Sequence, residues 1–247
     1  MASFRSFARR LLSRCGYAVL SLKNHYAEDG LFTVHNQGFR RDPRFREAYA
    51  RGAGEGLEWR VHVALWAAST ALRVSGDFVE CGVNAGVVSS AVMNYLNFST
   101  VPRKYYLIDT FSGPVLEQFS DDETRDGMSA RARRLLDAGA YVTDVDRVRA
   151  NFAEWPNAVV IQGAVPEALA RVPAESIAFL HIDMNCAMPE RAALEMLWPR
   201  IPRGGIVLLD DYAYWGHGHQ KDAIDDAARH LGVEVLSLPT GQGLIVA

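Results

Sequence analysis

The chain has 247 residues, of which 49% are hydrophobic and 22% are charged, and its formal net charge is −3. This length can bury the core of one α/β enzyme domain, and the charged fraction is ordinary for a globular protein. The charge is uneven, because residues 1–51 hold ten Lys and Arg against four Asp and Glu, whereas the rest of the chain is acidic. Nucleic-acid binding needs a broad basic surface, so this composition argues against a nucleic-acid partner.

Residues 1–56 read as a helical N-terminal extension with a basic start. Within residues 1–22, apolar side chains share one helical face among arginines, which leaves two alternatives: packing on the protein or weak contact with a membrane surface. Arg14 interrupts the apolar run that an export signal needs, and no run approaches the roughly 18 residues of a transmembrane helix. The cysteines are odd in number and lack metal-site spacing, so we expect reduced thiols and a cytoplasmic location.

A helical pattern follows over residues 57–74, and its spacing predicts one buried face. That face consists of Trp59, Val63, Trp66, Ala67 and Thr70. Strands and helices then alternate, which predicts an α/β fold with a mostly parallel sheet and right-handed crossovers. The expected strands are 77–81, 104–109, 158–162, 177–182 and 206–210, and the expected helices are 87–97, 189–200 and 220–231.

The chain closes with two apolar runs, 233–238 and 243–247. Only Pro-Thr-Gly-Gln separates them, which is too short for a crossover connection. We therefore expect an antiparallel hairpin that completes a sheet of seven strands.

The segment 76–86, Gly-Asp-Phe-Val-Glu-Cys-Gly-Val-Asn-Ala-Gly, holds the first candidate ligand site. A strand ends on Glu80, glycines follow at Gly82 and Gly86, and a helix begins at once. Glycine lets the backbone approach a ligand closely, and the helix start directs free N–H groups toward it. The spacing E-x-G-x-x-x-G differs from the G-x-G-x-x-G that binds a dinucleotide pyrophosphate.

The next strand also ends on a carboxylate, Asp109. In an open α/β sheet, a carboxylate at this position can bind both hydroxyls of a ribose. The two strand ends together predict a pocket for an adenosine-bearing ligand without a pyrophosphate.

A second group of carboxylates follows two later strands, as Asp183 and as the pair Asp210 and Asp211. Neighbouring strand residues point to opposite faces, so the pair can share a target only if the chain turns there, as the Tyr/Gly-rich sequence 212–218 suggests. Three converging carboxylates repel one another unless a cation lies between them, and aspartate oxygens suit Mg²⁺, Mn²⁺ or Ca²⁺. The alternative is that these aspartates only cap turns.

The element order and the E-x-G-x-x-x-G motif are similar to those of class I S-adenosylmethionine-dependent methyltransferases, which have a Rossmann-like fold. The segments G-D-F-V-E-C-G-V, Y-L-I-D-T-F-S-G and G-G-I-V-L-L-D-D-Y resemble, more narrowly, the macrocin and mycinamicin type of sugar O-methyltransferase. The resemblance covers roughly residues 57–247. One segment departs from that family, which usually has D-G-D-x-Y-x-S-T where this chain has Asp-Met-Asn-Cys-Ala-Met-Pro-Glu at 183–190. Asn185 replaces the second aspartate and the aromatic residue is lost, so the acceptor pocket must differ.

The resemblance implies S-adenosylmethionine as the methyl donor and Mg²⁺, or Mn²⁺ or Ca²⁺, as the metal. The implied cofactor-binding residues follow the first three strands: Glu80, Gly82, Asn84, Gly86, Asp109, Thr110, Gln162 and Gly163. The implied metal ligands are Asp183, Asp210 and Asp211, where the metal would activate the acceptor hydroxyl. Asp183 and His217 are the candidate general bases, with His219 as a further rival, whereas His181 is more simply a structural histidine.

Acceptor recognition is expected from the irregular parts of the chain. Residues 112–142 form a long insertion of the kind that often acts as a lid. Tyr212, Tyr214 and Trp215 either stack on a sugar or aromatic ring or pack the loop down. The aromatic-rich extension is expected to close over the site from the same chain or from a partner, and we expect a homodimer.

The leading hypothesis is a metal-dependent O-methyltransferase acting on a sugar hydroxyl of a glycoside, a nucleotide sugar or a surface-polysaccharide precursor. An alternative is the same chemistry on a catechol or other phenol. Cys186 stands where such enzymes commonly have a lysine, which counts against this alternative. From other classes, a nicotinamide-dependent oxidoreductase lacks its pyrophosphate fingerprint, and a non-catalytic nucleotide-binding module has little use for three carboxylates around a cation.

Overall fold

The computed structural model describes residues 35–52 and 56–247. The chain divides into two units, Met1–Gly38 and Phe39–Ala247. All the strands and the candidate site lie in the second unit. The basic residues 1–22, for which membrane-surface contact was one alternative, lie outside the described residues. Among the described residues, no helix combines the length and apolar character that crossing a bilayer requires.

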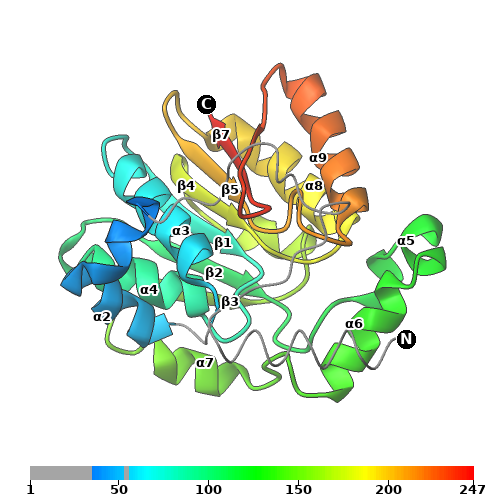
Figure 1. The fold of residues 1–247 in the computed structure, drawn as a ribbon, viewed down its shortest axis with the longest axis horizontal. Helices are drawn as coiled ribbons and strands as arrows, with labels where there is room; N and C mark the ends of the chain where they lie inside the picture. The colour runs from blue at the N-terminus through cyan, green and yellow to red at the C-terminus, as the bar shows by residue number, and fades with distance from the viewer. Residues whose placement is uncertain (1–34, 53–55) are drawn as a thin grey trace. The chain divides into compact units, whose positions relative to one another are not determined.

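A seven-stranded sheet forms the centre of the second unit (Figure 1). The strands are β1 (Asp77–Cys81), β2 (Tyr105–Asp109), β3 (Ala158–Gln162), β4 (Ile177–Ile182), β5 (Ile206–Leu209), β6 (Leu236–Ser237) and β7 (Gly243–Val246). Their order is β3-β2-β1-β4-β5-β7-β6, in which β1 to β5 pair in parallel and β7 pairs antiparallel with both β5 and β6. The predicted α/β class, the parallel sheet and the antiparallel C-terminal hairpin are therefore confirmed.

The order of the strands reverses between β1 and β4, because the chain builds outward from β1 to β3 before it returns to add β4. In open α/β sheets, ligands bind outside the carboxyl ends of the strands at such a reversal. We therefore expect a ligand site beside the residues that follow Cys81 and Ile182, where β1 and β4 end side by side.

Helices cover both faces of this sheet (Figure 1). They are α2 (Pro43–Gly52), α3 (Glu58–Ala71), α4 (Val87–Tyr95), α5 (Asp121–Arg125), α6 (Met128–Asp137), α7 (Val145–Asn151), α8 (Ala187–Leu197) and α9 (Gly218–Leu231), with short 3₁₀ helices between some of them. One core lies between the sheet and α2, α3, α4 and α7, and a second lies between the sheet and α8 and α9. Strand residues alternate between the two cores: Phe78 faces the first and Val79 the second, as the two-residue period of a strand requires.

The buried face predicted for the helix at 57–74 is right at Ala67, which is buried, and wrong at Trp66. The side chain of Trp66 is 53% exposed, whereas Val61 and Leu65 are buried, together with alanines on the same face. The helix is apolar on nearly all sides, so its periodicity does not single out one face. Alanines let α3 approach the sheet closely, and a Trp at the same contact would hold the helix away from it.

The predicted insertion at 112–142 contains regular structure: the 3₁₀ helix Leu116–Gln118 (η4), α5 and α6. The helix α5 begins with a capping box, in which Ser120 accepts a hydrogen bond from the Glu123 backbone N–H while the Glu123 carboxylate accepts one from the Ser120 N–H. Its role as a lid stays a prediction.

The described part of the predicted extension lies in the same core as the rest of the second unit. Phe45 and Ala48 of α2 are buried, and α2 packs against α4.

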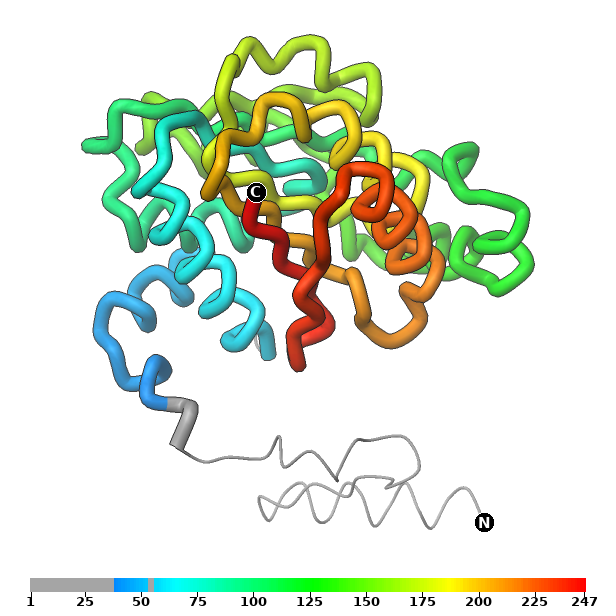
Figure 2. The backbone as a smooth tube through the Cα atoms, turned by 90° about the horizontal axis from the view of Figure 1, so that it is seen from above, coloured from blue at the N-terminus to red at the C-terminus, as the bar shows by residue number. Residues whose placement is uncertain are grey.

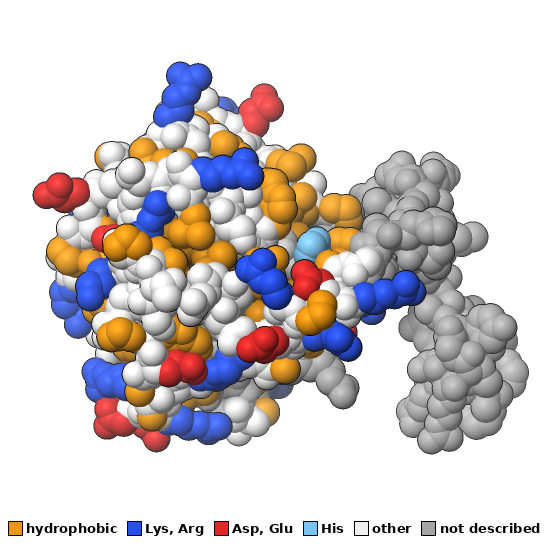
Figure 3. All heavy atoms as spheres, turned by 90° about the vertical axis from the view of Figure 1, so that its left-hand side faces the viewer, with side chains coloured by type: hydrophobic (Ala, Val, Ile, Leu, Met, Phe, Trp, Pro, Cys, Tyr) orange, Lys and Arg blue, Asp and Glu red, His pale blue; other side chains and the backbone are white. Residues whose placement is uncertain are grey.

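On the face drawn in Figure 3, positively and negatively charged side chains are interspersed with hydrophobic ones, without a broad patch of either sign.

Candidate active site

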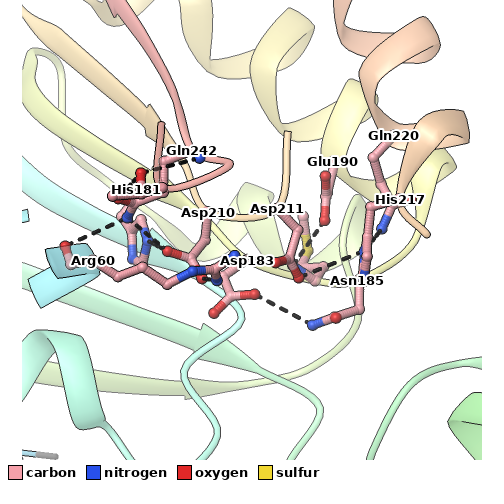
Figure 4. Close-up of polar contacts among 12 residues, drawn as sticks. Arg60, His181, Asp183, Asn185, Glu190, Asp210, Asp211, His217, Gln220 and Gln242 are labelled. Atoms are coloured by element: carbon pink, nitrogen blue, oxygen red, sulfur yellow. Dashed lines mark hydrogen bonds and ion pairs between the residues drawn. The ribbon is translucent and has the colours of Figure 1, made fainter. Parts of the chain in front are cut away.

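The carboxyl ends of β4 and β5 bring three carboxylates together. Asp183 follows β4, and Asp210 and Asp211 follow β5, which ends at Leu209. The chain turns after Leu209, so the two consecutive aspartates can share one target. One oxygen from each of the three lies within 4.8 Å of the others, and we call these residues the aspartate cluster (Figure 4).

Arg60, in the first turn of α3, contacts two members of the aspartate cluster (Figure 4). Its Nη1 donates to Asp210 Oδ2 and its Nη2 donates to Asp211 Oδ1, the second at 2.8 Å. The guanidinium also lies over the Tyr214 ring, with its central carbon 4.4 Å from the ring centroid. We did not predict this residue from the sequence, in which Arg60 is one charge within a largely apolar helix.

His181 connects the first candidate site with the aspartate cluster. It pairs in register with Glu80 across β1 and β4, and its Nδ1 lies 3.2 Å from Glu80 Oε1. Its Nε2 lies 3.8 Å from Asp210 Oδ1, which is longer than a hydrogen bond, and it is buried without a hydrogen-bond partner. Glu80 also accepts a 3.4 Å hydrogen bond from the Tyr105 hydroxyl, so its carboxylate is held within the protein interior.

Burial and charge shift the proton affinities of these groups in opposite directions. Burial, together with the charges of Asp210 and Asp211, raises the pKa of Asp183. Burial alone would lower the pKa of His181, but the flanking Asp210 and Glu80 outweigh it and raise that pKa to about 10. Burial also opposes ionisation of Asp210, yet His181 and Arg60 outweigh it and lower the Asp210 pKa. The cluster is therefore partly neutralised by two buried cationic side chains.

The donor set of the aspartate cluster fits a hard divalent cation, because all three candidate ligands are carboxylates. Asp183, Asp210 and Asp211 are the residues that would hold such an ion. Arg60 already contacts Asp210 and Asp211, so its guanidinium and an ion would share the same oxygens.

His217 lies beside the aspartate cluster at the N-cap of α9. It is 3% exposed, its Nδ1 lies 3.6 Å from Asp211 Oδ2, and the Gln220 amide nitrogen lies 2.7 Å from the same Nδ1. Burial lowers the pKa of His217 despite the opposing charge of Asp211. The rival His219 instead contacts Asp126 of the insertion at 2.8 Å. Of the two rivals, His217 is the one that borders the cluster.

The glycines of the first motif are required by close contacts within the protein. A Cβ on Gly82 would lie 1.8 Å from the Asp183 carbonyl oxygen, and Gly82 has a φ of +91°. A Cβ on Gly86 would lie 2.4 Å from the Phe152 ring, and this residue caps α4 with a φ of +81°. Gly82 therefore brings the backbone after β1 directly against the backbone after β4.

Asp109 organises the loop that follows β1. Its Oδ2 accepts hydrogen bonds from the backbone N–H groups of Val83 and Asn84, at 2.7 and 2.8 Å. Its Oδ1 accepts from the Phe111 N–H at 2.8 Å, which holds Phe111 in a left-handed conformation with a φ of +47°. Each carboxylate oxygen can accept more than one hydrogen bond, so Asp109 retains capacity for a ribose hydroxyl.

Asn84 ties the same loop to the end of the insertion. Its side-chain Nδ2 donates to the Ala140 carbonyl at 3.1 Å, and its Oδ1 accepts from the Val142 N–H at 2.8 Å. Thr110 donates to the Gly113 carbonyl at 2.6 Å, at the start of the insertion. Both ends of residues 112–142 are therefore held by predicted cofactor-binding residues.

A cavity of about 120 Å³ lies beside these strand ends. Its lining includes predicted residues at the ends of four strands, namely Gly82, Asn84, Asp109, Thr110, Gly163 and Asp183, together with Gly113, Val115 and Tyr141 from the insertion. The Gln162 side chain is exposed and donates to the Thr110 carbonyl at 3.3 Å, so the backbone at Gly163 forms this part of the wall. Glu80, with Arg60 and Asp210, lines a neighbouring cavity that Asn84 and Asp183 share.

Two buried glutamates that we did not predict hold the loop after Asp183. Glu190 Oε1 accepts from the Met184 N–H at 3.1 Å, and Glu123 Oε1 from the insertion accepts from the Ala187 N–H at 2.9 Å. Burial and the charge of Asp211 raise the pKa of Glu190 to about 8. These contacts leave Asn185 in a left-handed conformation, with its amide 3.3 Å from Asp183 Oδ1.

Comparisons with known proteins match most of the described chain. The family model described as macrocin-O-methyltransferase (TylF) matches residues 62–234, which include Glu80, Asp109 and the aspartate cluster. The chain is 29% identical over 166 residues to the 8-demethyl-8-(2,3-dimethoxy-alpha-L-rhamnosyl)-tetracenomycin-C 4'-O-methyltransferase of Streptomyces olivaceus. That alignment covers 65% of this chain and 60% of the relative, so the chain matches less than two thirds of the relative's length.

Solved structures share the fold. The O-methyltransferase NovP has a TM-score of 0.64 at 20% identity, with 76% of this chain and 78% of NovP covered. The calicheamicin methyltransferase CalS11 has a TM-score of 0.58 at 17% identity, with 87% of this chain and 93% of CalS11 covered. Taken with the family model, which matches well over half of the sequence, these findings lead to one conclusion: the chain belongs to the macrocin-O-methyltransferase family.

Proposed function

We propose that this protein transfers a methyl group from S-adenosylmethionine to a hydroxyl oxygen of a sugar, with a divalent cation held by the aspartate cluster. The observation that carries the proposal is the position of Asp183. This residue lines the cavity formed by the loops after β1, β2 and β3, and it also belongs to the aspartate cluster. A cofactor in that cavity and an acceptor at the cluster would therefore meet at one residue.

The cofactor-binding role rests on the residues that line the cavity. Asp109 would accept hydrogen bonds from the ribose hydroxyls, while Gly82 and Gly163 leave room for the ligand beside the backbone. The cofactor supplies an electrophilic methyl carbon on a sulfonium. The protein's part is to hold the acceptor oxygen in line with that carbon and to keep water away, and such positioning can supply much of the rate.

Two residues are candidates for the general base that takes the proton from the acceptor hydroxyl. His217 has a pKa below its ordinary value, so its imidazole is largely neutral near pH 7 and can accept a proton. The Asp183 carboxylate is the second candidate, because it belongs to the aspartate cluster and also lines the cavity. A divalent cation at the cluster, when bound, would lower the pKa of a hydroxyl placed against it.

The sugar acceptor is supported by the curated relative and by aromatic side chains near the cluster. The relative's name describes an acceptor that carries a rhamnosyl group. In this chain, Trp215 is 79% exposed and Tyr214 is 48% exposed, whereas Tyr212 is buried and donates to Asp225. Trp215 and Tyr214 are therefore available to stack on a sugar ring, and Tyr212 serves to pack the loop.

The test is a methyl-transfer assay with radiolabelled S-adenosylmethionine and a panel of deoxysugar nucleotides and rhamnosides, with Mg²⁺ or with EDTA. We expect label on a sugar hydroxyl that depends on the added cation, and label on catechol to be absent or much slower. Transfer that is faster to catechol, or unaffected by EDTA, would overturn the sugar or the metal part respectively. A homodimer, a cytoplasmic location and a lid at residues 112–142 remain predictions from the sequence.

A further inference from the structure

Arg60 is held at the aspartate cluster by three kinds of contact. Its two terminal nitrogens donate to two different carboxylates, Asp210 and Asp211. Its planar group lies over the Tyr214 ring. Its backbone carbonyl accepts a long hydrogen bond from Gln242, at 3.5 Å, in the turn before β7, which lies side by side with the start of α3 (Figure 2). The side chain is only 15% exposed, so this arrangement is part of the protein interior.

Arg60 occupies one oxygen of Asp210 and one oxygen of Asp211. On Asp210, Oδ1 accepts from Gln242 Nε2 at 2.8 Å and faces His181 Nε2 at 3.8 Å, whereas Oδ2 contacts Arg60. On Asp211, Oδ2 faces His217 Nδ1 at 3.6 Å, whereas Oδ1 contacts Arg60. The Oδ1 of Asp210 is already hydrogen-bonded, so a cation held by this residue would compete with the guanidinium for Oδ2.

Charge balance points the same way. Three carboxylates within 4.8 Å of one another cannot all stay ionised in a buried site without positive charge nearby. Arg60 places one positive charge against two of these carboxylates. Adding a divalent cation while the guanidinium stays in place would put two positive groups on the same pair of oxygens.

We propose that Arg60 is an internal counter-ion of the aspartate cluster, which holds the carboxylates together before the divalent cation binds and is displaced when it binds. This inference rests on the metal site of the proposed function. It makes Arg60 a positioning residue whose guanidinium and the metal compete for Asp210 and Asp211. The positive charge of Arg60 therefore lowers the affinity of the site for the metal and protects the metal-free fold from carboxylate repulsion.

The experiment measures Mn²⁺ binding by electron paramagnetic resonance and Mg²⁺ binding by calorimetry, in the wild type and in Arg60→Gln. We expect at least tenfold tighter binding of both ions by Arg60→Gln, because the competitor is gone. The matched control is Arg103→Gln, which removes one positive charge from an arginine that contacts only the carbonyls of Ala71 and Leu72, beyond the far end of α3. It corrects for the change in net charge and should bind both ions like the wild type.

Thermal unfolding gives a second readout that does not depend on activity. Metal-free Arg60→Gln should melt below the wild type, and saturating Mg²⁺ should raise its Tm more than it raises that of the wild type. If Arg60→Gln does not fold, Arg60→Lys serves instead, because it keeps the charge but cannot contact both carboxylates in the same way. We expect Arg60→Lys to bind Mn²⁺ more tightly than the wild type, because the lysine side chain cannot contact both carboxylates as the guanidinium does.

Unchanged or weaker ion binding by the Arg60 variants would overturn the displacement and make Arg60 a support of the bound ion. Absence of Mn²⁺ binding in every variant, the wild type included, would overturn both the displacement and the metal part of the proposed function. Titration of the same samples with S-adenosylhomocysteine tests the methyl-donor part separately, so the two failures can be told apart.

Discussion

Replacing Asp109 by Asn should weaken both the fold of the cofactor loop and the binding of S-adenosylhomocysteine. The carboxylate accepts three backbone hydrogen bonds, two on Oδ2 from Val83 and Asn84 and one on Oδ1 from Phe111. An amide has only one acceptor oxygen. If that oxygen keeps the N–H groups of Val83 and Asn84, the amide NH₂ faces the N–H of Phe111, and two donors then oppose each other.

The expected loss in the free energy of unfolding follows from the number of hydrogen bonds that Asp109 accepts. A hydrogen bond to a charged group contributes about 1.5–3 kcal/mol, and the two bonds that remain lose the assistance of the charge. We therefore expect the free energy of unfolding to fall by about 2–4 kcal/mol, which for a domain of this size lowers Tm by roughly 5–12 °C. Phe111 would be released from its left-handed conformation, which itself needs a restraint.

The assay is calorimetric titration with S-adenosylhomocysteine together with a thermal melt of each variant. We expect at least tenfold weaker binding, equivalent to about 1.4 kcal/mol, for Asp109→Asn. The matched control is Asp77→Asn, because Asp77 lies at the opposite end of β1 and its Oδ1 accepts a single hydrogen bond from the Lys104 N–H at 2.8 Å. An Asn oxygen can keep that bond. Wild-type affinity and Tm in Asp109→Asn would refute the role assigned to this carboxylate.

Three further substitutions test neighbouring parts of the site. Gly82→Ala places a Cβ 1.8 Å from the Asp183 carbonyl, so it should weaken S-adenosylhomocysteine binding at least tenfold by calorimetry; unchanged affinity would contradict the close approach. Glu123→Gln should speed amide exchange at Ala187, measured by mass spectrometry, because Glu123 accepts that N–H on one oxygen and the Ser120 N–H on the other, whereas Gln has one acceptor oxygen; equal rates would count against the anchor. The pKa of Glu190 is raised from 4.5 to about 8 in the folded protein. Between these pH values the folded metal-free protein keeps a proton that the unfolded chain has lost, so the free energy of unfolding should fall as the pH rises from about 5 to 8. Glu190→Gln should flatten this dependence in urea melts with EDTA, and a slope equal to that of the wild type would show another group to be responsible.

The sheet was predictable because its strands are short and apolar and end at carboxylates or glycines. β4 is buried along its whole length and β1 along all but its first residue, and both are mostly apolar apart from Asp77, Glu80 and His181. The antiparallel hairpin followed from the shortness of its connection. The buried face of α3 did not follow, because a helix that is apolar on most sides has no period that singles out the contact, and Trp66 lies at 53% exposure.

The aspartate cluster was predictable because its members lie at strand ends, where parallel topology forces them together. Arg60 and Gln242 were not, because they reach Asp210 from 150 and 32 residues away in sequence. Glu123 likewise reaches the start of α8 from an insertion that shows no clear pattern. A charged residue inside an apolar helix is a weak signal of such a contact, since most such residues are solvent-exposed.

For the glycines, the sequence identified the positions but not the physical reason. We expected Gly86 to admit a ligand, but its Cβ would instead meet the ring of Phe152, on the far side of the loop after β1. Gly82 is needed for the close approach to Asp183 as well as for the cavity it lines. Pairwise packing of this kind depends on where distant segments meet, which local motifs do not specify.

Titration of the purified chain with S-adenosylhomocysteine, with NAD⁺ as the control ligand, is the direct test of the cofactor that this cavity binds. We predict micromolar binding of S-adenosylhomocysteine, whose ribose the Asp109 carboxylate can bind. We predict no binding of NAD⁺, because the loop at 82–86 lacks the G-x-G-x-x-G fingerprint that binds a pyrophosphate. Binding of NAD⁺ in preference, or of neither ligand, would contradict the assignment of the cavity and the methyl-transfer chemistry built on it.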